Sequence, residues 1–410
     1  MYGHWSFNWV QIIAHNRGAL LSLFGVLSLG GLLGITQLEQ SISNTSWGLL
    51  VGSIFLMSLA MAKLLDSLKA ALLQLLLSLY ILLMTLGIVG WTSLVLDERS
   101  VLGLVILMTV MTSNLVHVLS TLLREMARGL FQYDAVAEAL KFNSSPILLA
   151  NLTSLLGFAF AAWYEPELST LAWIVGVGVT ISYLTTLSWL PLILLNWLLE
   201  FRVGSPSDRY GYAFVVAWME KSPGLLKLLL VLFTLVFIVL IWFAQDLLSL
   251  FLPLATMLIA MSVLFAVFWK SFKLALINTL ANVLALTLTV AAFYVVASQF
   301  AGWGQGNWSL LLLMVPMGLI VDDGIHFFSR YVRAQQGLFS DSTSAVRYAM
   351  ASVGRPIWIT SWIVVIGLLV LFFSPQPQIQ QASLITLISL VFATMIILFI
   401  IPAFLVRKSK

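Results

Sequence analysis

The chain has 410 residues, of which 61% are hydrophobic and only 9% are charged. Soluble globular domains carry roughly 25% charged residues, so this composition excludes a water-soluble protein and makes the bilayer the main solvent. Cysteine is absent, which excludes disulfides and thiolate chemistry. The formal net charge is only +4, and we expect no nucleic-acid partner.

Twelve segments are apolar over the length of about 20 residues that a membrane-spanning helix needs. In chain order they cover residues 18–36, 47–65, 69–89, 101–122, 145–163, 168–199, 224–244, 248–269, 273–298, 309–329, 356–373 and 383–404. The first is a full-length span with no small-residue cleavage site before it, so we expect no signal peptide. The predicted fold class is an all-α polytopic membrane protein.

The segments between these spans are short on one side of the membrane and longer on the other. On the short side, TQLEQSISNT follows the first span, and little more than QDL separates the seventh span from the eighth. On the longer side, FQYDAVAEALKF and DSTSAVRYAMASV have apolar residues at helical spacing, which predicts amphipathic helices at the membrane surface. We expect no extramembrane domain.

Lysines and arginines fix the predicted orientation, because cytoplasmic loops of membrane proteins carry an excess of both. If the N-terminus is cytoplasmic, all of the 20 Lys and Arg residues except Arg99 fall at cytoplasmic helix ends or loops. The opposite orientation breaks the rule almost everywhere. We therefore predict that both termini lie in the cytoplasm.

The chain also repeats itself with a period near 209 residues. The segment SNLVHVLSTLLREMARGLFQYDAVAEALKFNSSPI corresponds to DDGIHFFSRYVRAQQGLFSDSTSAVRYAMASVGRPI. His117 is equivalent to His326, and Pro146 is equivalent to Pro356. Two halves, 1–200 and 201–410, with six spans each in the same order, predict parallel repeats about an axis along the membrane normal.

One predicted span carries two acids and an imidazole, within MVPMGLIVDDGIHFFSR. Asp322 lies about 13 residues into this span, which is roughly 20 Å deep at 1.5 Å per residue. Charges at this depth are costly and normally face a bundle interior or a hydrated cavity. Burial and a neighbouring like charge favour the protonated form of one carboxyl group. Asp322 and Asp323 are therefore expected to exchange protons, with His326 one turn away as the relay partner.

The leading interpretation of this cluster is a proton relay. Its counterparts in the first half would face it across the repeat axis and supply hydrogen bonds to the charged acid; these supporting residues are Ser113, Asn114 and His117. Two other interpretations stay open: a buried polar pin that fixes helix register, and a cation site. No focused set of oxygen ligands favours the cation site, and we expect neither a metal nor a cofactor.

The second-half segment GLIVDDGIHFFSRYVR, followed by AVRYAMASVGRPIWITSWIVVIGLLVLFFSP, resembles the signature of the resistance-nodulation-division (RND) superfamily. The similarity is greatest to its MmpL-like and hopanoid-exporter-like branches. The resemblance implies a proton-driven exporter of lipids, drugs or other amphiphiles; relatives include SecDF and sterol-sensing proteins. It also implies that small hydroxyl groups lie next to the acids, which in this chain are Thr360 and Ser361.

The chain departs from the RND pattern in two ways. Members of the superfamily carry large extracytoplasmic domains after the first and seventh spans, and here both are replaced by short loops. The acids of the motif occur only in the second half, because Asp322 and Asp323 align with Ser113 and Asn114. The missing outer domains favour a module that works with another protein. The loss of the first-half acids fits a sensor-like bundle that binds a lipid or sterol.

The predicted function is a compact RND-type transporter module of the bacterial inner membrane. It would use the proton motive force to move a lipid-like substrate, with a separate periplasmic or membrane protein as partner. Two alternatives are a SecDF-like energy-converting or scaffold subunit and a lipid- or sterol-sensing bundle. No phosphate loop, dinucleotide fingerprint, metal triad or Ser-His-Asp motif is evident, so we do not expect an enzyme.

Overall fold

A computed structural model describes residues 4–92, 94–197, 216, 248–297, 310–339 and 341–406. Within these ranges the chain is helical, and the one strand-like pairing is a parallel bridge between Gln40 and Leu96. The predicted span 224–244 lies outside the described residues.

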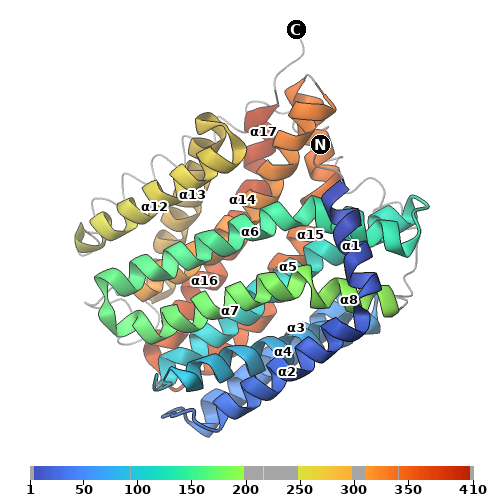
Figure 1. Ribbon diagram of the computed structural model, residues 1–410. Coiled ribbons are helices and arrows are strands. Elements are labelled where there is room, and N and C mark those ends of the chain that lie inside the picture. The colour runs from blue at the N-terminus through green and yellow to red at the C-terminus, as the bar shows by residue number, and fades with distance from the viewer. Residues whose placement is uncertain are drawn as a thin grey trace. The chain divides into compact units, whose positions relative to one another are not determined.

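Helices follow one another along the whole described chain (Figure 1). They are α1 (His4–His15), α2 (Arg17–Ile35), α3 (Asn44–Leu64), α4 (Leu68–Trp91), α5 (Glu98–Ala127), α6 (Gln132–Tyr164), η1 (Pro166–Leu168), α7 (Ser169–Leu187), α8 (Trp189–Asn196), α12 (Leu248–Trp269), α13 (Phe272–Ala297), α14 (Leu310–Gly337), α15 (Ser342–Leu369), η3 (Val370–Phe373), α16 (Pro377–Met395), η4 (Ile396–Ile400) and α17 (Ile401–Leu405). Eleven helical segments of the described chain are long and apolar enough to cross a membrane. The predicted all-α polytopic fold is confirmed.

The chain divides into two compact units. The first unit comprises residues 1–151, 167–205 and 362–379, and the second unit comprises 152–166, 206–361 and 380–410. Helix α6 therefore contributes to the first unit up to Asn151 and to the second from Leu152, and α15 changes unit after Ser361. The predicted repeat boundary near residue 200 stays a prediction, because these units group residues by contact and not by sequence similarity.

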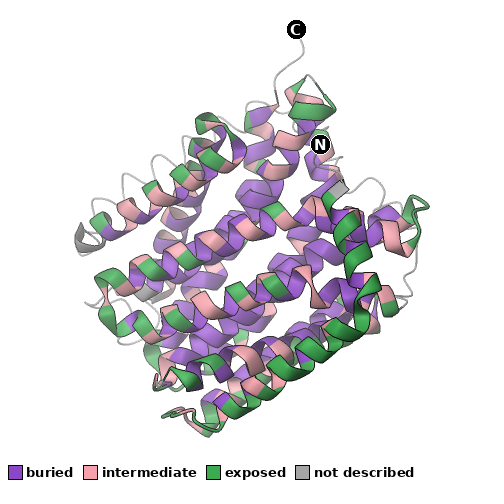
Figure 2. Ribbon diagram, in the orientation of Figure 1, coloured by how far each residue is buried: buried purple, intermediate pink, exposed green. Residues whose placement is uncertain are grey.

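In the first unit, α5 is the central helix and packs against α3, α4 and α7. Figure 2 shows α5 buried along almost its whole length, whereas α2 exposes most of its residues. Helix α5 begins with a capping box in which Asp97 and Ser100 each accept a hydrogen bond from the other's backbone N–H. Segment 362–379 closes this unit beside α3, where the Ser53 hydroxyl donates to the Gly367 carbonyl over 2.8 Å.

Helices α2 and α4 approach each other closely through glycines. A Cβ atom added at Gly34 would lie 2.0 Å from the carbonyl oxygen of Gly87, and one added at Gly90 would lie 2.0 Å from that of Gly34. Small residues that let two backbones meet are typical of helix pairs in membranes. This contact holds the otherwise exposed α2 against the first unit.

In the second unit, α14 packs against α12, α13 and η4. Its segment Leu312–Val321 is buried throughout. Bulky rings fill the space between α12 and α14, where Trp269 lies over Phe328 with the ring centroids 5.2 Å apart. This packing fixes the face that α14 turns toward its neighbours.

The turns before α4 and α13 are the same structure in the two halves of the chain. Asp66 and Lys270, which are 204 residues apart, both adopt positive φ, at 49° and 52°. A serine follows each of them, and its hydroxyl accepts a hydrogen bond from the backbone N–H three residues later, at Ala70 or Leu274. This matched turn places Gln74 of α4 and Asn278 of α13 at equivalent positions, because they too are 204 residues apart.

The segments FQYDAVAEALKF and DSTSAVRYAMASV, which are predicted to be amphipathic, are helical, but neither is a helix of its own. They form the first turns of α6 and α15, which continue through Pro146 and Pro356. Proline is tolerated inside membrane helices, because neighbouring groups and local adjustments satisfy the backbone carbonyls that it leaves free. The last predicted span is interrupted by the π-helix η4, just before Pro402.

Candidate functional site

Helix α14 carries the predicted acids near its middle. Asp323 is only 4% exposed, and Asp322, on the adjacent face, is partly buried. The helix is apolar before Asp322 and turns polar only after it, so both carboxyl groups lie deep in the second unit. Carboxyl groups at such positions in a membrane helix mark ion or proton pathways.

Hydroxyl groups from two other helices surround the Asp323 carboxylate. The Thr394 hydroxyl of α16 donates to Oδ2 over 3.0 Å, and the Ser361 hydroxyl of α15 reaches the same oxygen over 3.4 Å. The two hydroxyl oxygens are 2.6 Å apart. Asp323 forms no ion pair among the described residues, so its hydrogen bonds come from neutral groups.

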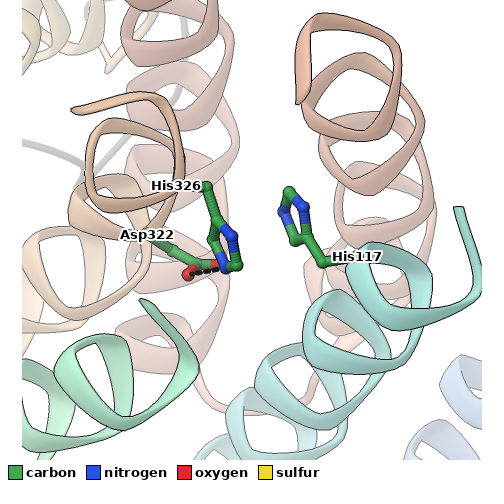
Figure 3. A group of neighbouring side chains, drawn as sticks. All are labelled: His117, Asp322 and His326. Atoms are coloured by element: carbon green, nitrogen blue, oxygen red, sulfur yellow. Dashed lines mark ion pairs between the residues drawn. The ribbon is translucent and has the colours of Figure 1, made fainter. Parts of the chain in front are cut away.

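Asp322 pairs with the imidazole of the next turn. Its Oδ1 atom lies 3.4 Å from Nε2 of His326, which makes an ion pair when the imidazole is protonated (Figure 3). The side chain of His326 is fully buried, and that of Asp322 is 17% exposed. Asp322 and His326 therefore lie on one face of α14.

The first unit holds the first-half counterparts, and their surroundings are built from neutral amides. The Asn114 amide donates to Oδ1 of Asn151 over 3.4 Å, and the Asn151 amide donates to the Val179 carbonyl over 3.2 Å. Ser113 and His117 are buried on the same helix, α5. That these residues face the acids across a repeat axis stays a prediction. Figure 3 draws the His117 side chain, and this residue belongs to the first unit.

Thr360 and Ser361 have different surroundings although they are adjacent. The Thr360 hydroxyl donates to the Ile357 carbonyl of its own helix over 2.8 Å, whereas Ser361 also reaches Asp323. Thr394, which donates the shortest hydrogen bond to Asp323, was not singled out by the sequence. The one signal for it is its place in the last span, eight residues before Pro402.

This arrangement allows proton exchange at a buried acid. A buried carboxyl group among neutral hydroxyls is stable when it is protonated. After it releases the proton, hydrogen bonds from the same hydroxyls stabilise the carboxylate. The second acid and the imidazole offer a further proton acceptor one turn away. No metal or cofactor is needed for such chemistry.

Comparisons with known proteins agree with this description. Residues 291–410, which include α14 to α17, match the MMPL family. Two solved structures share the fold: SecDF in a super-membrane-facing form, with a TM-score of 0.67, and SecDF from Thermus thermophilus, a translocon-associated membrane protein, with a TM-score of 0.68. Each is 14% identical to this chain and covers 88% of it.

The chain spans 62% of the length of those SecDF chains. No curated protein matches it. The predicted resemblance to the MMPL-like branch of the RND superfamily is confirmed by the match over 291–410, and the likeness to SecDF extends over the fold of most of the chain. Residues 291–410 are therefore similar to the MMPL family, and the chain shares a fold with SecDF over most of its length.

Proposed function

We propose that this module moves protons through Asp322, Asp323 and His326 and uses their flow to export or laterally move a lipid-like molecule. It would act in the bacterial inner membrane with both termini cytoplasmic. The observation that carries the proposal is the buried Asp323, whose hydrogen bonds come from the hydroxyls of Ser361 and Thr394. A static ion pair would instead place a cation against this carboxylate.

A separate protein would receive or deliver the substrate. The first outer loop has room only for the Gln40–Leu96 bridge and the turn around it, since α2 ends at Ile35 and α3 begins at Asn44. A loop of this size cannot enclose a lipid-like molecule. We therefore expect the module to rely on a periplasmic or membrane partner and on lipids that reach it within the bilayer.

A second candidate function is supported by the fold shared with SecDF. In that case the module would be an energy-converting or scaffold subunit that passes proton-driven motion to a partner complex. If the purified chain moves a lipid-like substrate in liposomes without another protein, this second candidate is excluded. If proton flux appears only when a co-purifying partner is present, it is favoured.

Proton uptake into liposomes that contain the purified chain tests the shared part of both functions. A pH gradient is imposed, and wild type is compared with Asp322→Asn, Asp323→Asn and the double variant. We expect flux in the wild type and background flux in Asp323→Asn, because an amide cannot release a proton.

Glu167→Gln is the matched control. The Glu167 side chain is 78% exposed, and its Oε2 atom lies 2.9 Å from Nη1 of Arg99. The substitution therefore removes one carboxylate without a change at the buried site. It should retain wild-type flux. Proton flux that survives in the Asp322→Asn/Asp323→Asn double variant, with or without the partner, would show that the two acids are a structural pin.

A further inference from the structure

Asn278 of α13 is a buried amide of the second unit. Its side chain is 0% exposed, and neither Nδ2 nor Oδ1 has a hydrogen-bond partner among the described residues. Buried amides in native proteins are almost always paired, because losing water without a replacement bond is costly. An unpaired amide at such a position indicates a role that satisfies it part of the time.

The amide lies against the helix that carries the acids. A Cβ atom added at Gly324 would lie 2.1 Å from Oδ1 and 3.1 Å from Cγ of Asn278. Gly324 directly follows Asp323, so the missing side chain is what lets the amide approach this turn of α14. Oδ1 is the amide atom that lies against Gly324, and the Nδ2 donor has no hydrogen-bond partner among the described residues.

The equivalent amide in the other half of the chain is fully engaged. Gln74 of α4 donates to the hydroxyls of Ser78 and Thr112 over 3.1 and 3.3 Å, and it accepts from the Ser58 hydroxyl. In the first unit, where α5 carries no acid nearby, the amide at this position has hydrogen-bond partners. In the second unit, where α14 carries the acids, the equivalent amide of Asn278 has none among the described residues.

The charged groups on the helices around Asn278 are few, and most of them lie at least one helical turn away from the acids. On α14 itself the nearest are His326 and Arg330, at one and two turns from the acids. Lys273 of α13 is exposed near the start of that helix, and Arg355 of α15 lies more than one turn before Ser361. Helices α12 and α16 and the π-helix η4, which also border this part of the second unit, contain no charged residue.

We infer that Asn278 is a positioning residue of the acid pair: its Nδ2–H group donates to the charged carboxylate, directly or through water, and Gly324 keeps the space that this requires. The inference rests on the proposed proton relay. In this role Asn278 of α13 helps to set the pH at which the acid pair releases its proton. The role also explains why an amide is buried there without a permanent partner.

Infrared difference titration of the purified chain tests this without any transport assay. The C=O stretch of a protonated buried carboxyl group is followed as pH rises, and the band lost in Asp323→Asn is assigned to the site. Asn278→Leu should raise the midpoint of this titration by about one pH unit, a tenfold change in proton affinity, because the charged form loses a donor. Gly324→Ala should move it in the same direction, because the new Cβ displaces the amide.

Two controls separate this role from packing. Gly318→Ala lies on the same helix, and its Cβ would meet only Phe158 at an ordinary 3.4 Å, so the midpoint should not move. Gln74→Leu removes a paired buried amide, so thermal stability should fall while the midpoint stays. The inference is overturned if Asn278→Leu and Gly324→Ala both keep the wild-type midpoint, or if either lowers it. Absence of any band that Asp323→Asn removes would instead refute the proton relay itself.

Discussion

Thr394 donates the shortest hydrogen bond to Asp323, over 3.0 Å. Thr394→Val replaces its hydroxyl by a methyl group of nearly the same volume, so the loss is one hydrogen bond to a charged group. Such bonds contribute about 1.5–3 kcal/mol, and we expect the pH of half-maximal proton flux in liposomes to rise by one unit or more. Thr386→Val on the same helix is the control, because that hydroxyl donates only to the Ala382 carbonyl. Equal shifts in both variants would contradict the assignment.

Asp341 forms the N-terminal cap of α15, outside the spans. The Ser344 backbone N–H donates to its carboxylate over 2.8 Å, and this bond lowers the pKa of Asp341 below its ordinary value. A lowered pKa means that the cap stabilises the fold above about pH 4 and loses this effect as pH falls through the folded-state pKa. Asp341→Ala should therefore lower the melting temperature at pH 7, and the difference from wild type should shrink at acidic pH. A difference that is independent of pH would show that the charge is not involved.

The sequence predicts Asp322, Asp323 and His326 because ionisable residues are rare within membrane spans. It does not predict Thr394 or Asn278. Serines and threonines are common in such helices and usually donate to a carbonyl of their own helix, as Thr360 does. Only packing decides which hydroxyl turns away from its helix toward a carboxylate on another.

At the scale of elements, the α2–α4 pair is held by glycines at which two backbones meet. Gly34→Ala would place a methyl group 2.0 Å from the Gly87 carbonyl oxygen, so the helices must separate. We expect a loss of about 1–3 kcal/mol in stability, visible as a lower melting temperature in detergent. Gly30→Ala on the same helix meets nothing within 4 Å and should leave that temperature unchanged or slightly raise it. Equal effects of the two variants would show that helix propensity, and not the contact, is responsible.

Span positions follow from hydropathy alone. The sequence predicts spans at residues 248–269 and 273–298, and α12 and α13 occupy Leu248–Trp269 and Phe272–Ala297. A helix is longer than its predicted span where a polar amphipathic turn continues into that span. The predicted span 145–163 is the second part of α6, which begins at Gln132. Hydropathy reports the membrane-embedded part of a helix and not the turns that extend beyond it.

At the scale of the molecule, the absence of cysteine makes topology directly testable. Gln37 follows α2, and Gln336 lies in the last turn of α14; both are exposed. With cytoplasmic termini, Gln37→Cys should react with a membrane-impermeant maleimide added to spheroplasts, and Gln336→Cys should react only after the membrane is opened. The reverse pattern would contradict the predicted orientation. The wild-type chain, with no thiol, is the blank.

The exchange of segments between the units has no signature in the sequence. The predicted repeat makes Pro146 equivalent to Pro356, but similarity cannot say in which unit the segment after each proline packs. The structure assigns 152–166 to the second unit and 362–379 to the first. The two segments begin at Leu152 and Trp362, which are 210 residues apart and therefore close to the predicted repeat period. Each half of the chain thus gives the segment at an equivalent position to the other unit.

This exchange has a consequence for biogenesis. When the ribosome has completed residue 205, the first unit still lacks the segment that fills the space beside Ser53 and Met57 of α3. That segment emerges more than 150 residues later, together with Gly367. The nascent chain must therefore wait in the membrane with a polar serine and an incompletely packed helix facing lipid or the insertion machinery. Neither half of the gene product can mature before the other, so a chain cut near residue 205 would need both fragments made together in one cell.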